Sequence, residues 1–256
     1  APINPDELEF LQENQIIFSP VHMPYITKEY LQKCIDKKII GIALGNIKDD
    51  AGNYPIVRTM SQIAGVRSIQ IASRYMSNMQ NGRGILLGGI AGVPPANVVI
   101  IGAGMVAEYA ARTALGSGAQ VKIFDNSIYR LLRLQGSVGQ TVFTCVMDPI
   151  QLSLALKDAD VVIGALKPSK GVVPMVVSEA MVQNMKPGTV IVDVCIDNGG
   201  CIETSKLTTH ENPTFLMHDV LHYCVPNIAS SVARTASTAI SNILMPLLLS
   251  STKTMG

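Results

Sequence analysis

A glycine-containing segment has the residue types and spacing of a phosphate-binding turn. In the stretch VVIIGAGMVAEYAAR, an apolar run precedes Gly102 and Gly104, and a helical pattern follows them. In such a strand, turn and helix the first glycine permits the tight turn, and the second lets the backbone approach a pyrophosphate. Ala107 is small enough for the helix to pack closely on the strand. The pattern therefore predicts a dinucleotide-binding βαβ unit.

An acidic residue completes this motif. Asp125 ends the next apolar run, AQVKIFD, 21 residues after Gly104. There its carboxylate can accept hydrogen bonds from both ribose hydroxyls of an adenosine, and its charge repels a 2′-phosphate, which favours NAD over NADP. The alternative is that the glycines serve only a turn and that Asp125 is a solvated strand end. With the exposed amides of the helix N-terminus, the predicted cofactor-binding residues are Gly102, Gly104, Met105, Val106 and Asp125.

Two further carboxylates lie near the end of a later apolar run. The segment GTVIVDVCIDNGGC contains Asp193 and Asp197, followed by a pair of glycines. Because the carboxyl ends of the strands of a doubly wound sheet face the ligand crevice, we expect Asp197 to touch the nicotinamide or the substrate. Asp193 lies earlier in the strand and is expected to be structural. The alternative for Asp197 is a loop cap without a catalytic role.

Among the four histidines, His22 is the candidate acid/base. It closes the apolar run QIIFSPVHM, at the carboxyl end of an expected strand, and an imidazole titrates near neutral pH. His218 and His222 are four residues apart but lack a Glu at metal-ligand spacing, so no metal site is expected. His210 lies in the polar TTHENP turn and is expected to be exposed.

The elements that must position these residues alternate between strand and helix. Helical patterns of about a dozen residues separate apolar runs, which indicates an α/β fold, a Rossmann doubly wound parallel sheet of about five or six strands. The strands are expected in ANVVIIGAG, AQVKIFD, TVFTCV, DVVIGAL and GTVIVDVCID, the last extending to Asp197, with FLMHDVLHYCV as another short strand and turn.

The amino-terminal part predicts a partial second, flavodoxin-like α/β domain. A short helix from Glu7 to Asn14 and a strand precede a helix that Thr27 caps and that runs through Asp36, with Glu29 and Lys33 on one face. The strand KIIGIALG follows. A long helix in TMSQIAGVRSIQIASRYMSNM is interpreted as a link between two domains.

The predicted domain organisation has three segments. Residues 1–62 form a partial substrate domain, residues 63–231 form the NAD-binding domain with its leading linker helix, and residues 232–256 return to the substrate domain. The pattern after Ser230 predicts a final helix to Leu249, broken near Pro246.

Composition narrows the range of partners. The 256 residues carry a formal net charge of +1 with scattered Lys and Arg, so neither nucleic acid nor an anionic membrane is expected as a partner. Five cysteines without a CxxC pair argue against disulfides and a structural zinc site, and favour a cytoplasmic location. Apolar runs such as 243–249 are too short to span a bilayer. Because the chain starts at Ala1, in a stretch typical of the middle of a protein sequence, we expect a segment to precede it.

At several segments the chain resembles the alanine dehydrogenase family, which shares its fold with the NAD-binding subunit of proton-translocating transhydrogenase. The resemblance covers nearly the whole chain. Its specific motifs are the LLGG…GVPP loop and the VDVxID-x-GG strand. The segments that carry it are MSQIAG at 60–65, GRGILLGGIAGVPPANVVIIGAG at 82–104, KPGTVIVDVCIDNGGCIETS at 186–205 and HYCVPNI at 222–228.

The resemblance implies a function and a site. It implies reversible NAD-dependent oxidative deamination of L-alanine to pyruvate and ammonia, by a homo-oligomer (dimer or hexamer), with the substrate bound between two domains. His22 and Asp197 match the family's catalytic pair, and Asp125 matches its ribose-binding acid. Leu166, Asn227 and Ile228 match positions that line the cofactor crevice.

The family's substrate-binding Arg and Lys lie upstream of Ala1, which leaves open whether this chain is active by itself. The chain departs from the family's usual residues at Arg58, Thr59 and Asn198. These departures leave open the alternative that the substrate is a different amino or oxo acid. The sequence is also compatible with a transhydrogenase-like subunit and with a non-catalytic NAD-binding module.

Overall fold

Two compact units make up the chain. The computed structural model describes residues 5–20, 27–80, 82–167 and 172–253. The smaller unit comprises residues 1–60 and 237–256, and the larger unit comprises residues 61–236. The divisions fall within the long helices α2 (Pro55–Tyr75) and α7 (Ala233–Lys253).

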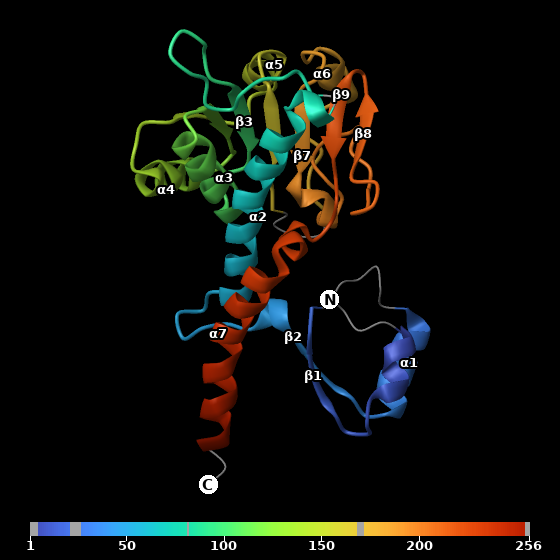
Figure 1. Cartoon of the computed structure of the whole chain (residues 1–256). Helices are drawn as coiled ribbons and strands as arrows, with labels where there is room; N and C mark the ends of the chain where they lie inside the picture. The colour runs from blue at the N-terminus through green and yellow to red at the C-terminus, as the bar shows by residue number, and fades with distance from the viewer. Residues whose placement is uncertain (1–4, 21–26, 81, 168–171, 254–256) are drawn as a thin grey trace. The chain divides into compact units, whose positions relative to one another are not determined.

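A seven-stranded sheet forms the centre of the larger unit (Figure 1). Its order, β5-β4-β3-β6-β7-β9-β8, places the first strand of the unit, β3, between β4 and β6, so the chain winds outward in both directions from β3. All pairs are parallel except β8 with β9, which confirms the predicted doubly wound α/β fold. The strands are β3 Asn97–Ile101, β4 Gln120–Phe124, β5 Phe143–Cys145, β6 Val161–Gly164, β7 Val190–Asp193, β8 Thr214–Met217 and β9 Val220–Tyr223.

The strands read as continuous apolar runs because both faces of the sheet are buried. Alternate residues of β3 point to opposite faces: Val98 and Ile100 belong to one core cluster, and Val99 and Ile101 belong to another. Helices α2, α3 and α4 cover the first face, and α5 and α6 cover the second. The covering helices after α2 are α3 Met105–Gly116, α4 Ile128–Val138, α5 Pro149–Lys157 and α6 Glu179–Gln183.

The sheet has more strands than the five or six predicted. The segment expected to be one short strand and a turn is a hairpin, β8 and β9, which adds two strands at one edge. Its two turn residues, His218 and Asp219, both have positive φ, at 53° and 58°. A tight hairpin of this kind is usually signalled by Gly or Asn, and the sequence His-Asp gives a much weaker signal.

Close approach of α2 and α3 depends on Gly65 in the MSQIAG segment. A Cβ at Gly65 would collide with the carbonyl oxygen of Val106 and lie 2.8 Å from Cβ of Tyr109. We expect Gly65→Ala to lower the free energy of unfolding by about 2 to 3 kcal/mol, because backbone must move to admit the methyl group. Gly136→Ala is the matched control, since Gly136 is an exposed residue of α4 with no atom within 4 Å of the new Cβ. There we expect a gain of about 0.5 to 1 kcal/mol. Urea unfolding of both variants measures the difference, and equal effects would contradict this packing.

The smaller unit contains one βαβ repeat, as predicted. Strands β1 (Ile16–Ser19) and β2 (Ile40–Ala43) pair in parallel, and α1 (Lys28–Asp36) connects them. The predicted cap is present, because the Tyr30 amide donates to Oγ1 of Thr27 at 3.1 Å. The predicted pair on one face is also present, with Lys33 Nζ 3.5 Å from Glu29 Oε1.

The predicted helix from Glu7 to Asn14 is wrong. A 3-10 helix, η1, spans Pro5–Phe10 instead. The ammonium group of Lys37 donates hydrogen bonds to the carbonyl oxygens of Leu8, Glu9 and Leu11, each at 2.8 Å. A single cation thereby satisfies carbonyl groups that a longer helix would bond internally. Two further 3-10 turns, η3 Leu44–Asn46 and η4 Asn78–Gln80, occur later in the chain.

The predicted break at Pro246 is also wrong, because α7 continues through this residue to Lys253. Proline removes one amide donor, and the neighbouring turns keep the helix intact. As a result, the helical stretch Ile228–Leu249 is, by length and composition, the one described segment that could cross a membrane, with a hydropathy of 1.3. A single helix of this kind is weak support for a membrane span.

Candidate functional site

The first candidate residue, Gly102, forms the turn after β3. Its φ is +111°, which residues other than glycine rarely adopt, and a Cβ would lie 2.6 Å from the carbonyl oxygen of Ala165. The Gly102 amide donates to the carbonyl of Phe124 at 2.7 Å. Leu166 follows Ala165, and its amide nitrogen lies 3.2 Å from the same Cβ position. The tertiary fold therefore brings Leu166 next to the glycine turn, just beyond the carboxyl ends of β3 and β6.

Gly104 has a different environment. It caps α3 with φ −83° and ψ −167°, and no atom lies within 4 Å of the position that a Cβ would take. The helix begins at Met105, so the amides of Met105 and Val106 belong to the first turn, where no intrahelical acceptor exists. The open space beside Gly104 lies next to these donors. A phosphate group at this place would meet the first amides of the helix.

Asp125 is not the solvated strand end that one interpretation of the sequence allowed. Its side chain is almost fully buried, at 1% exposure. One carboxylate oxygen, Oδ2, accepts from the Ala103 amide at 2.8 Å, and Oδ1 accepts from the Ser127 amide at 2.7 Å. The carboxylate thus joins the glycine turn to the loop after β4. Each oxygen of a carboxylate has two lone pairs, so Oδ2 retains an acceptor position for a ligand hydroxyl.

Two arginines of α4 belong to this site and were not predicted. Arg130 Nη2 lies 3.1 Å from Oδ1 of Asp125, and Arg133 Nη2 donates to the carbonyl of Ala103 at 3.1 Å. Their spacing of three residues places both on one face of the helix. Basic residues at this spacing, directly after an acidic strand end, are the signal that could have identified them.

The two carboxylates of the later strand have different environments. Strand β7 ends at Asp193, earlier than predicted, and the 3-10 helix η5 (Val194–Asn198) follows it. The chain turns there because Oδ1 of Asp193 accepts from the Cys195 amide at 3.2 Å, while Oδ2 accepts from the Cys201 amide at 3.2 Å. Burial raises the pKa of Asp193, although hydrogen bonds from Cys195 and Cys201 act in the opposite direction. Asp193 has the structural environment expected for it.

Asp197 is exposed on η5 and contacts a second predicted residue. Its two oxygens lie 3.0 and 3.3 Å from the amide nitrogen of Asn227, which donates to them. Asn227 adopts φ +52° and caps the 3-10 helix η6 (Ile228–Val232), whose first residue is buried. Asn227 lies 30 positions after Asp197 in the sequence and contacts it in the fold.

A buried group of potential metal ligands lies at the start of η5 and in the loop that follows it. The ligand atoms of Asp193, Cys195 and Cys201 lie within 4.8 Å of one another. The Cys195 thiol donates to Asp193 Oδ1 at 3.0 Å, and both carboxylate oxygens also accept backbone amides. The carboxylate therefore already accepts two backbone amides and one thiol. All five cysteines are free thiols.

The histidines lie apart from these residues where they are described. His22 lies outside the described residues. His218 Nε2 lies 2.7 Å from Glu179 Oε1, and His222 shares a hydrogen bond of 2.8 Å with the hydroxyl of Thr204. His210 is exposed, as predicted, and lies 3.1 Å from the Ser230 hydroxyl.

Buried His222 makes stability depend on pH. Burial lowers its pKa from 6.5 to about 4, so the folded state holds this imidazole neutral while the unfolded chain protonates it. The contribution of His222 to the free energy of unfolding is complete above pH 6.5 and is lost as the pH falls towards 4. We expect a loss of about 3 kcal/mol over this range. Thermal unfolding between pH 7.5 and 4 should show a steeper decrease for the native protein than for His222→Gln, which does not titrate. Parallel curves would contradict the assignment.

Comparison with known proteins shows the family to which this chain is related. The sequence model of the alanine dehydrogenase/PNT C-terminal domain matches residues 68–255. The chain is 42% identical over 247 residues to the alanine dehydrogenase of Methanococcus maripaludis, covering 95% of this chain and 65% of that relative. It is 39% identical over 248 residues to the alanine dehydrogenase of Mycolicibacterium smegmatis, covering 97% and 66%.

Solved structures show the same relationship. A solved structure of an L-alanine dehydrogenase matches with a TM-score of 0.90 at 36% identity, over 96% of this chain and 68% of that one. A transhydrogenase from Sinorhizobium meliloti matches with a TM-score of 0.81 at 21% identity, over 96% and 71%, which shows a shared fold. The chain spans about two thirds of the length of the relatives it matches. On its sequence and its fold, this chain belongs to the alanine dehydrogenase/PNT C-terminal domain family.

Proposed function

We propose that the larger unit binds NAD at the glycine turn. The open space at Gly104, beside the first amides of α3, fits a pyrophosphate, and a Cβ there would fill the same space. The Asp125 carboxylate next to this turn is the acceptor for the ribose hydroxyls. Met105, Val106, Leu166, Asn227 and Ile228 are proposed to complete the cofactor site.

The charge of Asp125 is the proposed reason for a preference for NAD over NADP. We expect Asp125→Asn to narrow the ratio of the NADH and NADPH dissociation constants by about tenfold, because the repulsion of a 2′-phosphate is removed. Arg130 would also lose its carboxylate partner and become available to pair with that phosphate. Fluorescence titrations with both nucleotides measure the ratio. Asp158→Asn is the charge-matched control at an exposed residue of another helix end. An unchanged ratio in Asp125→Asn would exclude this role.

We infer that the protein catalyses the reversible oxidative deamination of L-alanine. L-Alanine, NAD and water give pyruvate, ammonium, NADH and a proton. The relationship to alanine dehydrogenases at about 40% identity over most of the chain carries this proposal. Bound NAD supplies the hydride acceptor.

The chain's own residues are proposed to manage protons and charge. Asp197, exposed at the carboxyl end of the sheet, orients the attacking water or the amine and stabilises the cationic imine of the substrate. His22 is proposed as the acid/base that exchanges a proton with the oxygen delivered by this water, which becomes the carbonyl oxygen of pyruvate. The Asn227 amide holds the Asp197 carboxylate through both oxygens, which limits its rotation.

The proposed activity is tested by following NADH formation at 340 nm with the full-length gene product. We expect formation with L-alanine, at a higher kcat/KM than with serine or glycine, and its loss in His22→Ala. A preference for another 2-amino acid would select the alternative of a related amino-acid dehydrogenase. Binding of NAD without turnover of any amino acid would select a non-catalytic or transhydrogenase-like module.

We also propose that the protein acts on small molecules in the cytoplasm as a homo-oligomer, without nucleic acid or membrane partners. The net charge of +1 and the five free thiols support this environment.

A further inference from the structure

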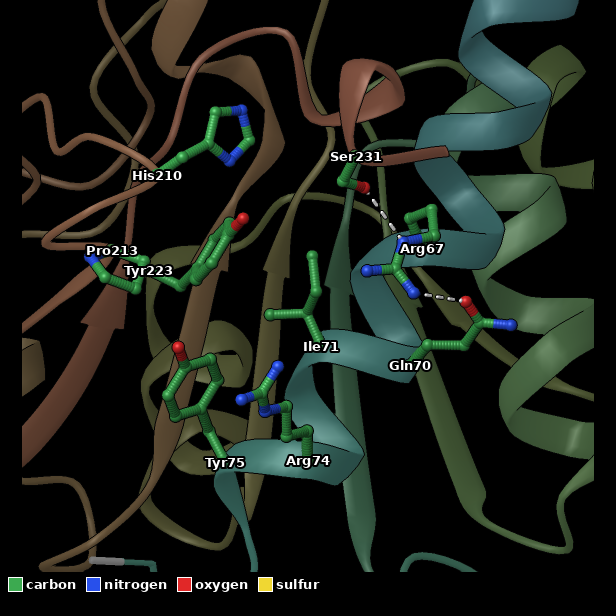
Figure 2. A pocket seen from close by; sticks show the side chains of 9 residues that line it. All are labelled: Arg67, Gln70, Ile71, Arg74, Tyr75, His210, Pro213, Tyr223 and Ser231. Carbon is green, nitrogen blue, oxygen red and sulfur yellow. Dashed lines mark hydrogen bonds between the residues drawn. The ribbon is translucent and has the colours of Figure 1, made fainter. Parts of the chain in front are cut away.

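A pocket of about 250 Å³ lies in the larger unit, on residues that the proposed NAD site does not use (Figure 2). One wall is a single face of α2, because its residues are spaced three or four positions apart. Figure 2 shows residues from three later segments on the other side. The α2 residues are Arg67, Gln70, Ile71, Arg74 and Tyr75, and the others are His210, Pro213, Tyr223 and Ser231.

The two arginines of this wall have no carboxylate partner. Arg67 donates from Nε to the Ser231 hydroxyl at 3.1 Å and from Nη1 to the amide oxygen of Gln70 at 2.8 Å, and both acceptors are neutral. Arg74 lies 5.9 Å from the ring centre of Tyr75. Among the described residues, no Asp or Glu lies within ion-pair distance of either guanidinium. Seven residues of helix separate them by about 10 Å along the axis, so they flank the pocket.

Two phenol groups add donors to the same space. Tyr75 and Tyr223 are 8% and 6% exposed, and their ring centres lie 6.0 Å apart. Neither hydroxyl has a hydrogen-bond partner in the part of the chain that the structure describes. Burial, and then the nearby Tyr75, raise the pKa of Tyr223, against a lowering by Arg67 and Arg74. Tyr223 therefore remains a protonated donor at neutral pH.

The remaining surface of the pocket is apolar. Ile71, Pro213 and the two tyrosine rings provide it. A ligand that fits this lining has an oxyanion group, which can accept bidentate hydrogen bonds from a guanidinium, and a small apolar body. At about 30 Å³ for each liquid water molecule, the pocket has the volume of roughly eight waters. This volume limits the apolar body of the ligand to about the size of one aromatic ring.

We propose that this pocket is a binding site for a small organic acid, a carboxylate or a phosphate monoester, held between Arg67 and Arg74 with the hydroxyls of Tyr75 and Tyr223 as additional donors. The ligand is distinct from NAD, because none of these residues belongs to the proposed NAD site. Ser231 is the residue that adjoins that site, since its hydroxyl donates to the carbonyl oxygen of Ile228 at 2.8 Å.

Calorimetric titration of the protein at low salt tests the proposal, with phenyl phosphate, benzoate and inorganic phosphate as probes. We expect phenyl phosphate or benzoate to bind one equivalent, with a dissociation constant of about 1 mM or lower. The tighter of these two probes identifies the acid group. Inorganic phosphate is expected to bind at least several-fold more weakly, because it lacks the apolar body.

Matched variants locate the binding. Arg74→Gln and Arg67→Gln should each weaken the tighter probe by about tenfold, and Tyr223→Phe by several-fold. Lys157→Gln, which removes an equal charge from an exposed position of α5, should leave binding unchanged. Gly104→Val should also leave it unchanged, because the glycine turn is not involved.

Three results would overturn the proposal. They are the absence of saturable binding up to about 10 mM, equal affinities in Arg74→Gln and Lys157→Gln, and loss of binding in Gly104→Val. If no probe binds and Arg74→Gln changes the molar mass measured by light scattering, the pocket is a contact between two copies of the chain. Circular dichroism melting of each variant shows whether a loss of binding reflects a loss of fold.

Discussion

Gly104→Val is expected to weaken NAD binding by about 100-fold while leaving the protein folded, because it fills the space beside the first amides of α3. Apart from the two neighbouring residues of the chain, no atom lies within 4 Å of the new Cβ, and φ −83° with ψ −167° is an extended conformation that valine readily adopts. The free energy of unfolding should therefore change by no more than about 1 kcal/mol. Calorimetric titration with NAD and urea unfolding measure the two quantities separately.

Gly102→Val provides the contrast at a neighbouring glycine. Its φ of +111° and the 2.6 Å approach to the Ala165 carbonyl predict a loss of stability of about 3 kcal/mol or more, together with the loss of binding. The variant at Gly104 thus tests the contact with the ligand, and the variant at Gly102 tests the conformation of the backbone. If Gly104→Val binds NAD as the native protein does, the pyrophosphate does not lie at this turn.

Asp197→Asn should lower kcat for L-alanine oxidation by about 100- to 10,000-fold in the full-length gene product. Asparagine keeps an oxygen that can accept the Asn227 amide, so the η5 conformation is expected to remain, and only the charge and the proton acceptor are lost. The affinity for NADH should stay unchanged. Stopped-flow measurement of NADH formation, with a parallel NADH titration, tests both statements.

Asp158→Asn is the control for a lost negative charge, and its kcat should equal that of the native protein. A fully active Asp197→Asn variant would show that this carboxylate is only a loop cap, the alternative that the sequence left open. A variant that loses NADH affinity as well would place the effect in the cofactor site instead of the chemical step.

Much of the fold and of the nucleotide site follows from local sequence. The apolar strand before Gly102, the helical pattern from Met105 and the acidic end of the next strand are each defined within about 28 residues of chain, 98–125. Turn geometry, strand burial and helix termini depend on neighbouring residues, so the pattern predicts them. The cap at Thr27 was predicted for the same reason.

The early end of β7 shows where local patterns stop being sufficient. The run of apolar residues continues past Asp193, and periodicity alone extends the strand to Asp197. The carboxylate of Asp193 instead bonds the amides of Cys195 and Cys201 and turns the chain into η5. A buried acceptor must find donors, and which donors it finds depends on the folded loop.

The sequence by itself determined the doubly wound fold and the glycine turn, because these rest on short-range backbone constraints and on hydrophobic periodicity. The resemblance to the family came instead from specific motifs, the LLGG…GVPP loop and the VDVxID-x-GG strand. Only the tertiary structure joined Asp197 to the Asn227 amide and Arg67 to Ser231. Arg67 and Ser231 are 164 positions apart. Such contacts depend on where separate elements pack on the sheet. The sequence around a charged or polar side chain is the same whichever distant partner it contacts, so that sequence does not identify the partner.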